Sequence, residues 1–158
     1  GYGSALLASC IEDARRQGKS GVCMLGAQKQ KAWLSDQSFA RRFGFETVDA
    51  TPDGYELLAL SLDGTKPRFA PSVTQRIDDK GLVVYYDMQC PFIPARVAVL
   101  QKYCAEQGIP ARFVEVDSLA AAKSLPCVFN NWAVFYGGTF QTVNQLDPTA
   151  LERILKRK

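Results

Sequence analysis

The chain has 158 residues, of which 47% are hydrophobic, 22% charged and 11% aromatic, and its formal net charge is +3. This apolar content supports a buried core in one medium domain or two small ones, and it excludes a disordered polypeptide. The charge excess is too small to predict a nucleic-acid surface. The longest apolar runs have the length of strands, so we expect no membrane span.

The chain contains no histidine and five cysteines. The lack of histidine excludes Ser-His and Cys-His catalysis within these residues. No Cys-x-x-Cys pair is present, so we expect neither a zinc ribbon nor a dithiol oxidoreductase motif, and no metal site. With no secretory signal visible, we expect reduced thiols in a cytoplasmic protein. Because the sequence opens on Gly1 and not on methionine, we expect a piece of a longer polypeptide.

Helical and extended patterns alternate along the first part of the chain. Leu7, Ile11 and Ala14 recur at helical spacing, and Gly18 is a common residue just beyond a helix end. Proline, aspartate and glycine at 52–54 are typical of a turn between strands. The expected order is α-β-α-β-β, with elements over residues 4–17, 22–25, 36–44, 45–48 and 55–60.

Residues 64–81 combine prolines, glycines and charges with little periodicity. We expect a linker here, between one domain over 1–63 and another over 82–158. An ordered surface loop with one helical turn is the alternative, suggested by the spacing of Val73 and Ile77.

The second domain opens with a β-branched and aromatic strand, followed by a helix that begins at Cys90-Pro91. Gly137-Gly138 predicts a hairpin turn, and Asp147 predicts the cap of a last helix. The expected order is β-α-β-α-β-β-α, which is the connectivity of a thioredoxin-like domain. The predicted fold class is therefore α/β (α+β). The elements are expected over residues 82–86, 91–107, 111–116, 118–123, 129–136, 139–143 and 148–155.

Gly1-Tyr2-Gly3-Ser4 leads directly into the first helix. Glycines let a backbone approach a phosphate, and the free N–H groups and dipole of a helix start favour its charge. A plain tight turn is the simpler interpretation. Further along, Gly44-Phe45 ends the second expected helix.

These motifs resemble the second half of the GNAT acetyltransferase fold. Gly1 and Gly3 match the last two glycines of its Q/R-x-x-G-x-G/A turn, and Gly44-Phe45 matches the end of its Tyr-x-x-x-Gly-Phe pattern. The resemblance implies transfer of an acetyl group from acetyl-CoA to an amine by direct attack. It also implies that Gly1, Tyr2, Gly3 and Ser4 bind the pyrophosphate of acetyl-CoA.

The sequence differs from the GNAT pattern at the usual general acid. Ala40 occupies the position of the tyrosine and cannot donate a proton. Tyr2, or a residue outside this chain, is the alternative acid. The strands that hold the acceptor and the pantetheine would precede Gly1, so we expect the fragment alone to be inactive. The resulting half-sheet has an open edge that invites pairing with a second copy.

The segments 87–93, 125–127 and 132–138 resemble the YoaP-like domain, which follows a GNAT domain in a set of bacterial proteins. The two resemblances together cover essentially the whole chain.

Cys90 lies before a helix, a place that favours the thiolate. Pro126 stands where thioredoxin-like folds carry a cis-proline that faces the first-helix cysteine, so Cys127 is expected to approach Cys90. Two semi-buried packing thiols are one interpretation, and a redox, persulfide or soft-ligand site through Cys90 and Cys127 is another. A non-catalytic interaction domain is a third. We expect Cys10, Cys23 and Cys104 to be shielded on apolar faces.

Overall fold

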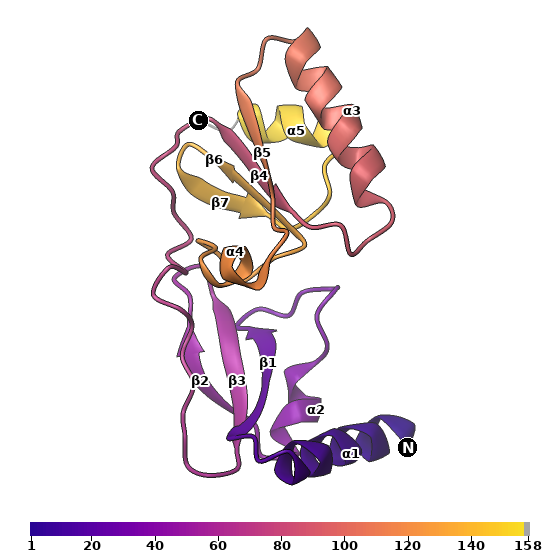
Figure 1. The fold of residues 1–158 in the computed structure, drawn as a ribbon, viewed down its shortest axis with the longest axis vertical. Coiled ribbons are helices and arrows are strands. Elements are labelled where there is room, and N and C mark those ends of the chain that lie inside the picture. Colours follow the sequence, from indigo (N-terminus) through magenta and orange to yellow (C-terminus); the bar gives the residue numbers. More distant parts are fainter. Residues whose placement is uncertain (157–158) are drawn as a thin grey trace. The chain divides into compact units, whose positions relative to one another are not determined.

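The computed structural model describes residues 1–156, which divide into two compact units between Phe69 and Ala70 (Figure 1). Each unit has its own sheet. This mixed arrangement of helices and two sheets confirms the predicted α+β class. No helix in the described part of the chain is both long and apolar enough to cross a membrane.

The first unit has the expected order α-β-α-β-β. Its strands form one antiparallel sheet in the order β1-β3-β2. The β2–β3 register shifts at Val48, which is a bulge in β2. The elements are α1 (Tyr2–Arg16), β1 (Gly21–Ala27), α2 (Gln37–Arg41), β2 (Glu46–Ala50) and β3 (Tyr55–Ser61).

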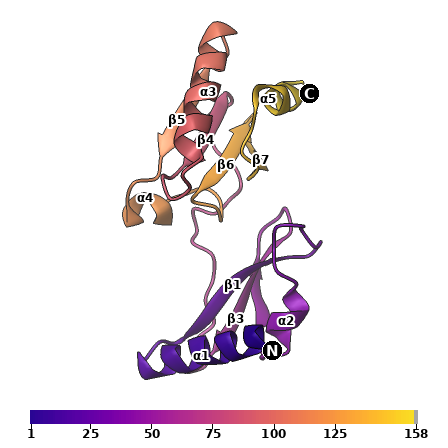
Figure 2. The ribbon, with the colours of Figure 1, turned by 90° about the vertical axis from the view of Figure 1, so that its right-hand side faces the viewer.

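Both helices of this unit pack on one face of the sheet (Figure 2), because Ile11 of α1 and Ala40 of α2 share a buried cluster with Leu58 of β3. The side chain of Asp36 caps α2 by accepting a hydrogen bond from the Ser38 N–H at 2.8 Å. Beyond α2 the chain turns through Gly44 at φ +86°, a conformation that favours glycine. The predicted end of this helix at Gly44 is therefore confirmed.

The second unit also has its expected order, β-α-β-α-β-β-α. Its sheet has the order β5-β4-β6-β7, in which β4 runs parallel to β5 and antiparallel to β6. The elements are β4 (Leu82–Tyr86), α3 (Ile93–Glu106), β5 (Ala111–Glu115), α4 (Leu119–Lys123), β6 (Trp132–Tyr136), β7 (Thr139–Thr142) and α5 (Pro148–Leu155).

Helices α3 and α5 cover one face of this second sheet, where Leu100 and Leu151 pack with Val84 and Trp132 in a single buried cluster. The face behind it carries Phe135, whose ring meets those of Tyr85 and Phe140 edge to face. The sheet is thus buried on both sides, as its apolar strands indicate.

Residues 70–80, here called the strap, differ from the predicted linker, because they are ordered and belong to the second unit. Gln75 is buried, its N–H donates to the Pro126 carbonyl at 2.8 Å, and its carbonyl accepts from the Phe140 N–H at 3.1 Å. Ile77 N–H donates to the Gly138 carbonyl at 3.0 Å. The strap opens with one hydrogen-bonded turn, in which the Val73 N–H donates to the Ala70 carbonyl at 2.9 Å. Its bonds with Pro126 and with the β6–β7 hairpin hold it in place.

Candidate functional site

The first turn of α1 is open to solvent. Gly1 is its N-cap, and no side chain caps the helix. The N–H groups of Tyr2, Gly3 and Ser4 therefore lie in the turn where a helix has no internal acceptors. No acidic residue stands in this turn, and an added Cβ at Gly1 would have no heavy atom within 4 Å. The turn has room and positive potential for an anion.

An aromatic side chain of α2 lies beside this turn. An added Cβ on Gly3 would be 3.6 Å from the Cζ atom of Phe39. The Arg42 guanidinium carbon in turn lies 5.9 Å from the centre of the Phe39 ring. The structure thus brings Phe39 to the first turn of α1 and Arg42 to the Phe39 ring. Neither residue could be placed at the site from the sequence, because only the fold connects α2 with Gly3.

Ala40 is fully buried at 0% exposure, in the cluster with Ile11, Phe45 and Leu58. A side chain at this position faces the core of the unit and has no access to a bound molecule. Tyr2 is the opposite case, since 91% of its surface is exposed.

Cys90 lies in the loop between β4 and α3. The helix begins at Ile93 and not at the predicted Pro91, because residues 88–92 form a turn that the Ile93 N–H closes onto the Cys90 carbonyl at 3.1 Å. The thiol is half-buried against the core, and the Gln145 amide nitrogen lies 3.7 Å from its sulfur. Cys90 is therefore three residues before the first helical residue.

Asp87 holds this loop in place. Its buried carboxylate accepts hydrogen bonds from the Gln89 N–H at 3.0 Å and from the Asn130 side chain at 3.1 Å. Its own N–H donates to the Asn131 carbonyl at 3.3 Å. These bonds make Asp87 a structural residue that ties the β4–α3 loop to the segment before β6.

The cis-proline expected at Pro126, beside Cys127, is not found. The peptide bond before Pro126 is trans, since the described residues contain no cis peptide. Cys127 is buried, and its thiol donates to the Phe129 carbonyl at 3.3 Å, whereas Cys90 meets Gln145. The two thiols thus have different hydrogen-bond partners, and neither cysteine forms a disulfide in the described residues.

The expectation that Cys10 and Cys23 are shielded is wrong, because both are exposed. Cys10 lies on the outer side of α1, away from the buried stripe through Ile11. Cys23 lies on an edge strand, although neighbouring atoms desolvate it enough to raise its pKa. Cys104 is buried as expected, and burial also raises its pKa.

Limited alkylation of the native chain at neutral pH should therefore label Cys10, Cys23 and Cys90 first. Cys104 and Cys127 should react only after unfolding, since burial blocks access to their thiols. Peptide mass mapping with and without denaturant measures this order. Labelling of Cys127 before Cys10 in the native chain would contradict it.

Within residues 1–156, no group of three or more cysteine, aspartate and glutamate side chains is placed to hold a metal ion.

Two comparisons with known proteins bear on this geometry. A family model described as YoaP-like matches residues 110–153. The chain is also 28% identical, over 98% of its length, to the Bacillus subtilis (strain 168) protein named "Uncharacterized N-acetyltransferase YoaP", of which it spans 63%. Both matches carry the same family name. They support a relationship to a family that includes a protein named as an N-acetyltransferase. No solved structure matches the chain.

Proposed function

We propose that the whole protein is an acyl-CoA-dependent N-acetyltransferase, which transfers an acetyl group from acetyl-CoA to an amine. Residues 1–69 supply part of the acyl-CoA site, as one half of a GNAT domain. Residues 70–158 form an attached YoaP-like domain with a thioredoxin-like order of elements.

The observation that carries this proposal is the exposed first turn of α1 with its two glycines, Gly1 and Gly3. It occurs in a chain that is similar, over nearly its whole length, to a protein named as an N-acetyltransferase. The order α-β-α-β-β in the first unit also supports the GNAT resemblance.

The residues at this turn fit the pyrophosphate of acetyl-CoA. The N–H groups of Tyr2, Gly3 and Ser4 are donors in a turn without acidic side chains. Phe39 packs beside Gly3, and the Arg42 guanidinium lies over the Phe39 ring. Acetyl-CoA supplies the acyl group, and this turn binds and orients its diphosphate.

The proton for the departing thiolate comes from a group other than residue 40, because Ala40 is buried and has no acidic hydrogen. Tyr2 is the alternative acid, since its N–H lies in the proposed pyrophosphate site and its phenol is exposed. The acceptor amine binds to parts of the whole protein beyond these residues. The 158-residue chain alone is therefore expected to bind acetyl-CoA without turning it over.

Calorimetric titration of the chain with acetyl-CoA tests the site. Gly3→Pro removes one N–H at a position where a helix tolerates proline. It should weaken the binding of acetyl-CoA roughly tenfold, because one charge-assisted hydrogen bond is lost. The matched control is Ser4→Ala, which keeps its N–H and should leave the affinity within roughly twofold.

A second arm of the titration uses pantetheine, which lacks the pyrophosphate and should not bind. Equal affinities of acetyl-CoA for Gly3→Pro and the unmodified chain would contradict the proposed site. Binding of pantetheine as tight as that of acetyl-CoA would contradict it as well. Acetyl transfer by the purified 158-residue chain would contradict the proposal that part of the active site lies outside these residues.

A further inference from the structure

A surface groove of about 580 Å³ lies in the second unit, between the strap and the β6–β7 turn. Strap residues between Thr74 and Lys80 form one wall, and Gly137, Gly138 and Thr139 form the other. All of these residues belong to the second unit. The volume falls in the range of sites that bind small molecules.

Two backbone hydrogen bonds join the walls of this groove. The Ile77 N–H donates to the Gly138 carbonyl at 3.0 Å, and the Gly137 N–H donates to the Lys80 carbonyl at 3.1 Å. Gly138 is buried at φ +80°, and an added Cβ there would lie 2.9 Å from the Ile77 carbonyl oxygen. Glycine therefore fits this position for two reasons, its positive φ and the close approach of the strap. The groove is already formed in the absence of a bound molecule.

The strap enters the groove through a strained residue. Gln75 has φ 58°, a left-handed conformation that residues other than glycine, asparagine and aspartate seldom adopt. Its backbone bonds with Pro126 and Phe140 hold it in this conformation. Backbone strain of this kind is concentrated at functional sites and ligand clamps. The next residue is Arg76, whose bridge with Thr139 places it beside the turn.

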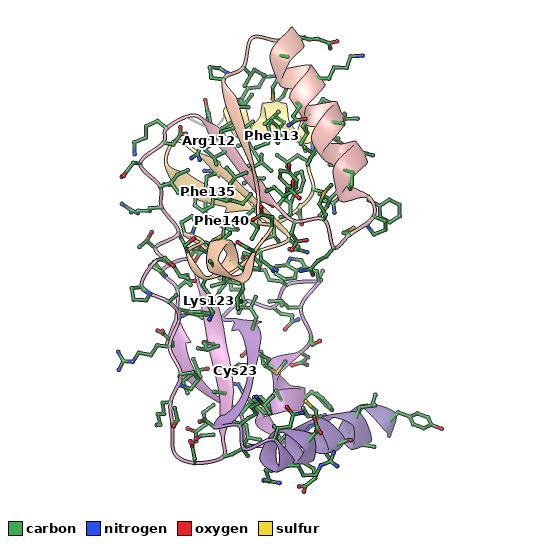
Figure 3. All side chains as sticks on the ribbon, viewed as in Figure 1. Cys23, Arg112, Phe113, Lys123, Phe135 and Phe140 are labelled. Carbon is green, nitrogen blue, oxygen red and sulfur yellow. The ribbon has the colours of Figure 1, made fainter. Side chains whose placement is uncertain are left out.

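Three charged side chains line the groove, and none of them has an ion-pair or hydrogen-bond partner within residues 1–156. They are Arg76, Asp78 and Lys80. The neighbouring Asp79 differs, because its carboxylate lies 3.4 Å from the guanidinium of Arg112 on β5, which Figure 3 labels. The hydroxyl groups of Thr74 and Thr139 already donate to backbone carbonyls. A bound molecule therefore meets one guanidinium, one ammonium and one carboxylate.

We propose that this groove binds a small phosphorylated amine. The guanidinium of Arg76 and the ammonium of Lys80 donate charge-assisted hydrogen bonds to the phosphate oxygens. The Asp78 carboxylate accepts hydrogen bonds from the amino group of the same molecule. Because Asp78 also repels a simple anion, a molecule with charges of both signs fits the groove better than phosphate alone.

Titration of the 158-residue chain with phosphoethanolamine, followed by amide NMR spectra, tests this site. The amide signals of Arg76, Gly138 and Thr139 should shift. Phosphoethanolamine should bind roughly tenfold more tightly than inorganic phosphate, because its amino group adds a charge-assisted hydrogen bond to Asp78. Ethanolamine, which lacks the phosphate, should not shift these signals. Absence of shifts at the groove, or equal affinities for phosphoethanolamine and inorganic phosphate, overturns the proposal.

A matched pair of arginine variants tests the phosphate contact. Arg76→Gln should weaken the binding of phosphoethanolamine roughly tenfold, because a charged donor is lost. Arg68→Gln removes the same charge from an exposed residue outside the groove, and it should leave the affinity within roughly twofold. Equal losses in the two variants would mean that only net charge matters, and they would contradict a site at the groove.

Asp78→Asn tests the contact with the amino group, because it should change the affinities for the two probes in opposite directions. Phosphoethanolamine should bind more weakly once the carboxylate is gone. Inorganic phosphate should bind more tightly, since a like charge has been removed. Asp78 is exposed, so the substitution leaves the core intact. An unchanged ratio of the two affinities would contradict the proposed role of this carboxylate.

Discussion

A polypeptide of residues 70–158 should fold on its own and should be more stable than one of residues 82–158. The shorter piece lacks the strap, whose backbone bonds with Pro126, Gly138 and Phe140 the structure shows. It also lacks the acceptor for the Gly137 N–H, which bonds to the Lys80 carbonyl at 3.1 Å. Since a hydrogen bond within a protein contributes a net ~1 kcal/mol, we expect the loss to exceed ~2 kcal/mol of unfolding free energy. Urea denaturation of the two pieces measures the difference.

The matched control for this comparison is the piece 64–158. Residues 64–69 belong to the first unit, where the Phe69 N–H donates to Asp49. Their addition to 70–158 should therefore leave the denaturation midpoint unchanged. Equal midpoints for 70–158 and 82–158 would show that the strap does not contribute to the stability of this unit.

Leu151→Ala should destabilise the second unit by about 2–5 kcal/mol, the usual cost of removing a buried leucine side chain. Leu151 is 0% exposed and packs in the cluster with Leu100 and Trp132. Fluorescence of Trp132 reports unfolding of this unit, once Trp33→Phe has removed the other tryptophan.

Leu119→Ala makes the same chemical change on α4, where the side chain is 71% exposed. It should alter the unfolding free energy by no more than about 0.5 kcal/mol. A similar loss of stability in both variants would mean that Leu151 is not part of a close-packed core.

The order of elements in both units could be predicted because the signals are local. Asp36 and Asp147 cap their helices through N–H groups two or three residues away, and Gly44 takes its positive φ just after α2. The strap could not be predicted in this way. Its partners, Pro126 and Gly138, lie far along the chain, and Gln75 adopts φ 58° without being glycine or asparagine.

The candidate site shows the same division between local and long-range information. The glycines of the α1 turn were visible in the sequence, but the approach of Phe39 to Gly3 depends on both helices packing on one face of the sheet. The exposure of Cys10 and Cys23 was missed because an apolar neighbourhood in sequence predicts burial only where another element covers it. Proline at position 91 fits a turn as well as a helix start, which explains the displaced beginning of α3.

The burial of Ala40 has an evolutionary consequence. The methyl group of Ala40 shares a buried cluster with Ile11, Phe45 and Leu58. A single substitution of this alanine by tyrosine would overpack the core and strain the sheet against both helices. A lineage with this packing can accept a large side chain at position 40 only after neighbouring side chains have become smaller. The alanine is therefore entrenched by its neighbours, and a proton donor for any bound molecule is more readily acquired at an exposed position.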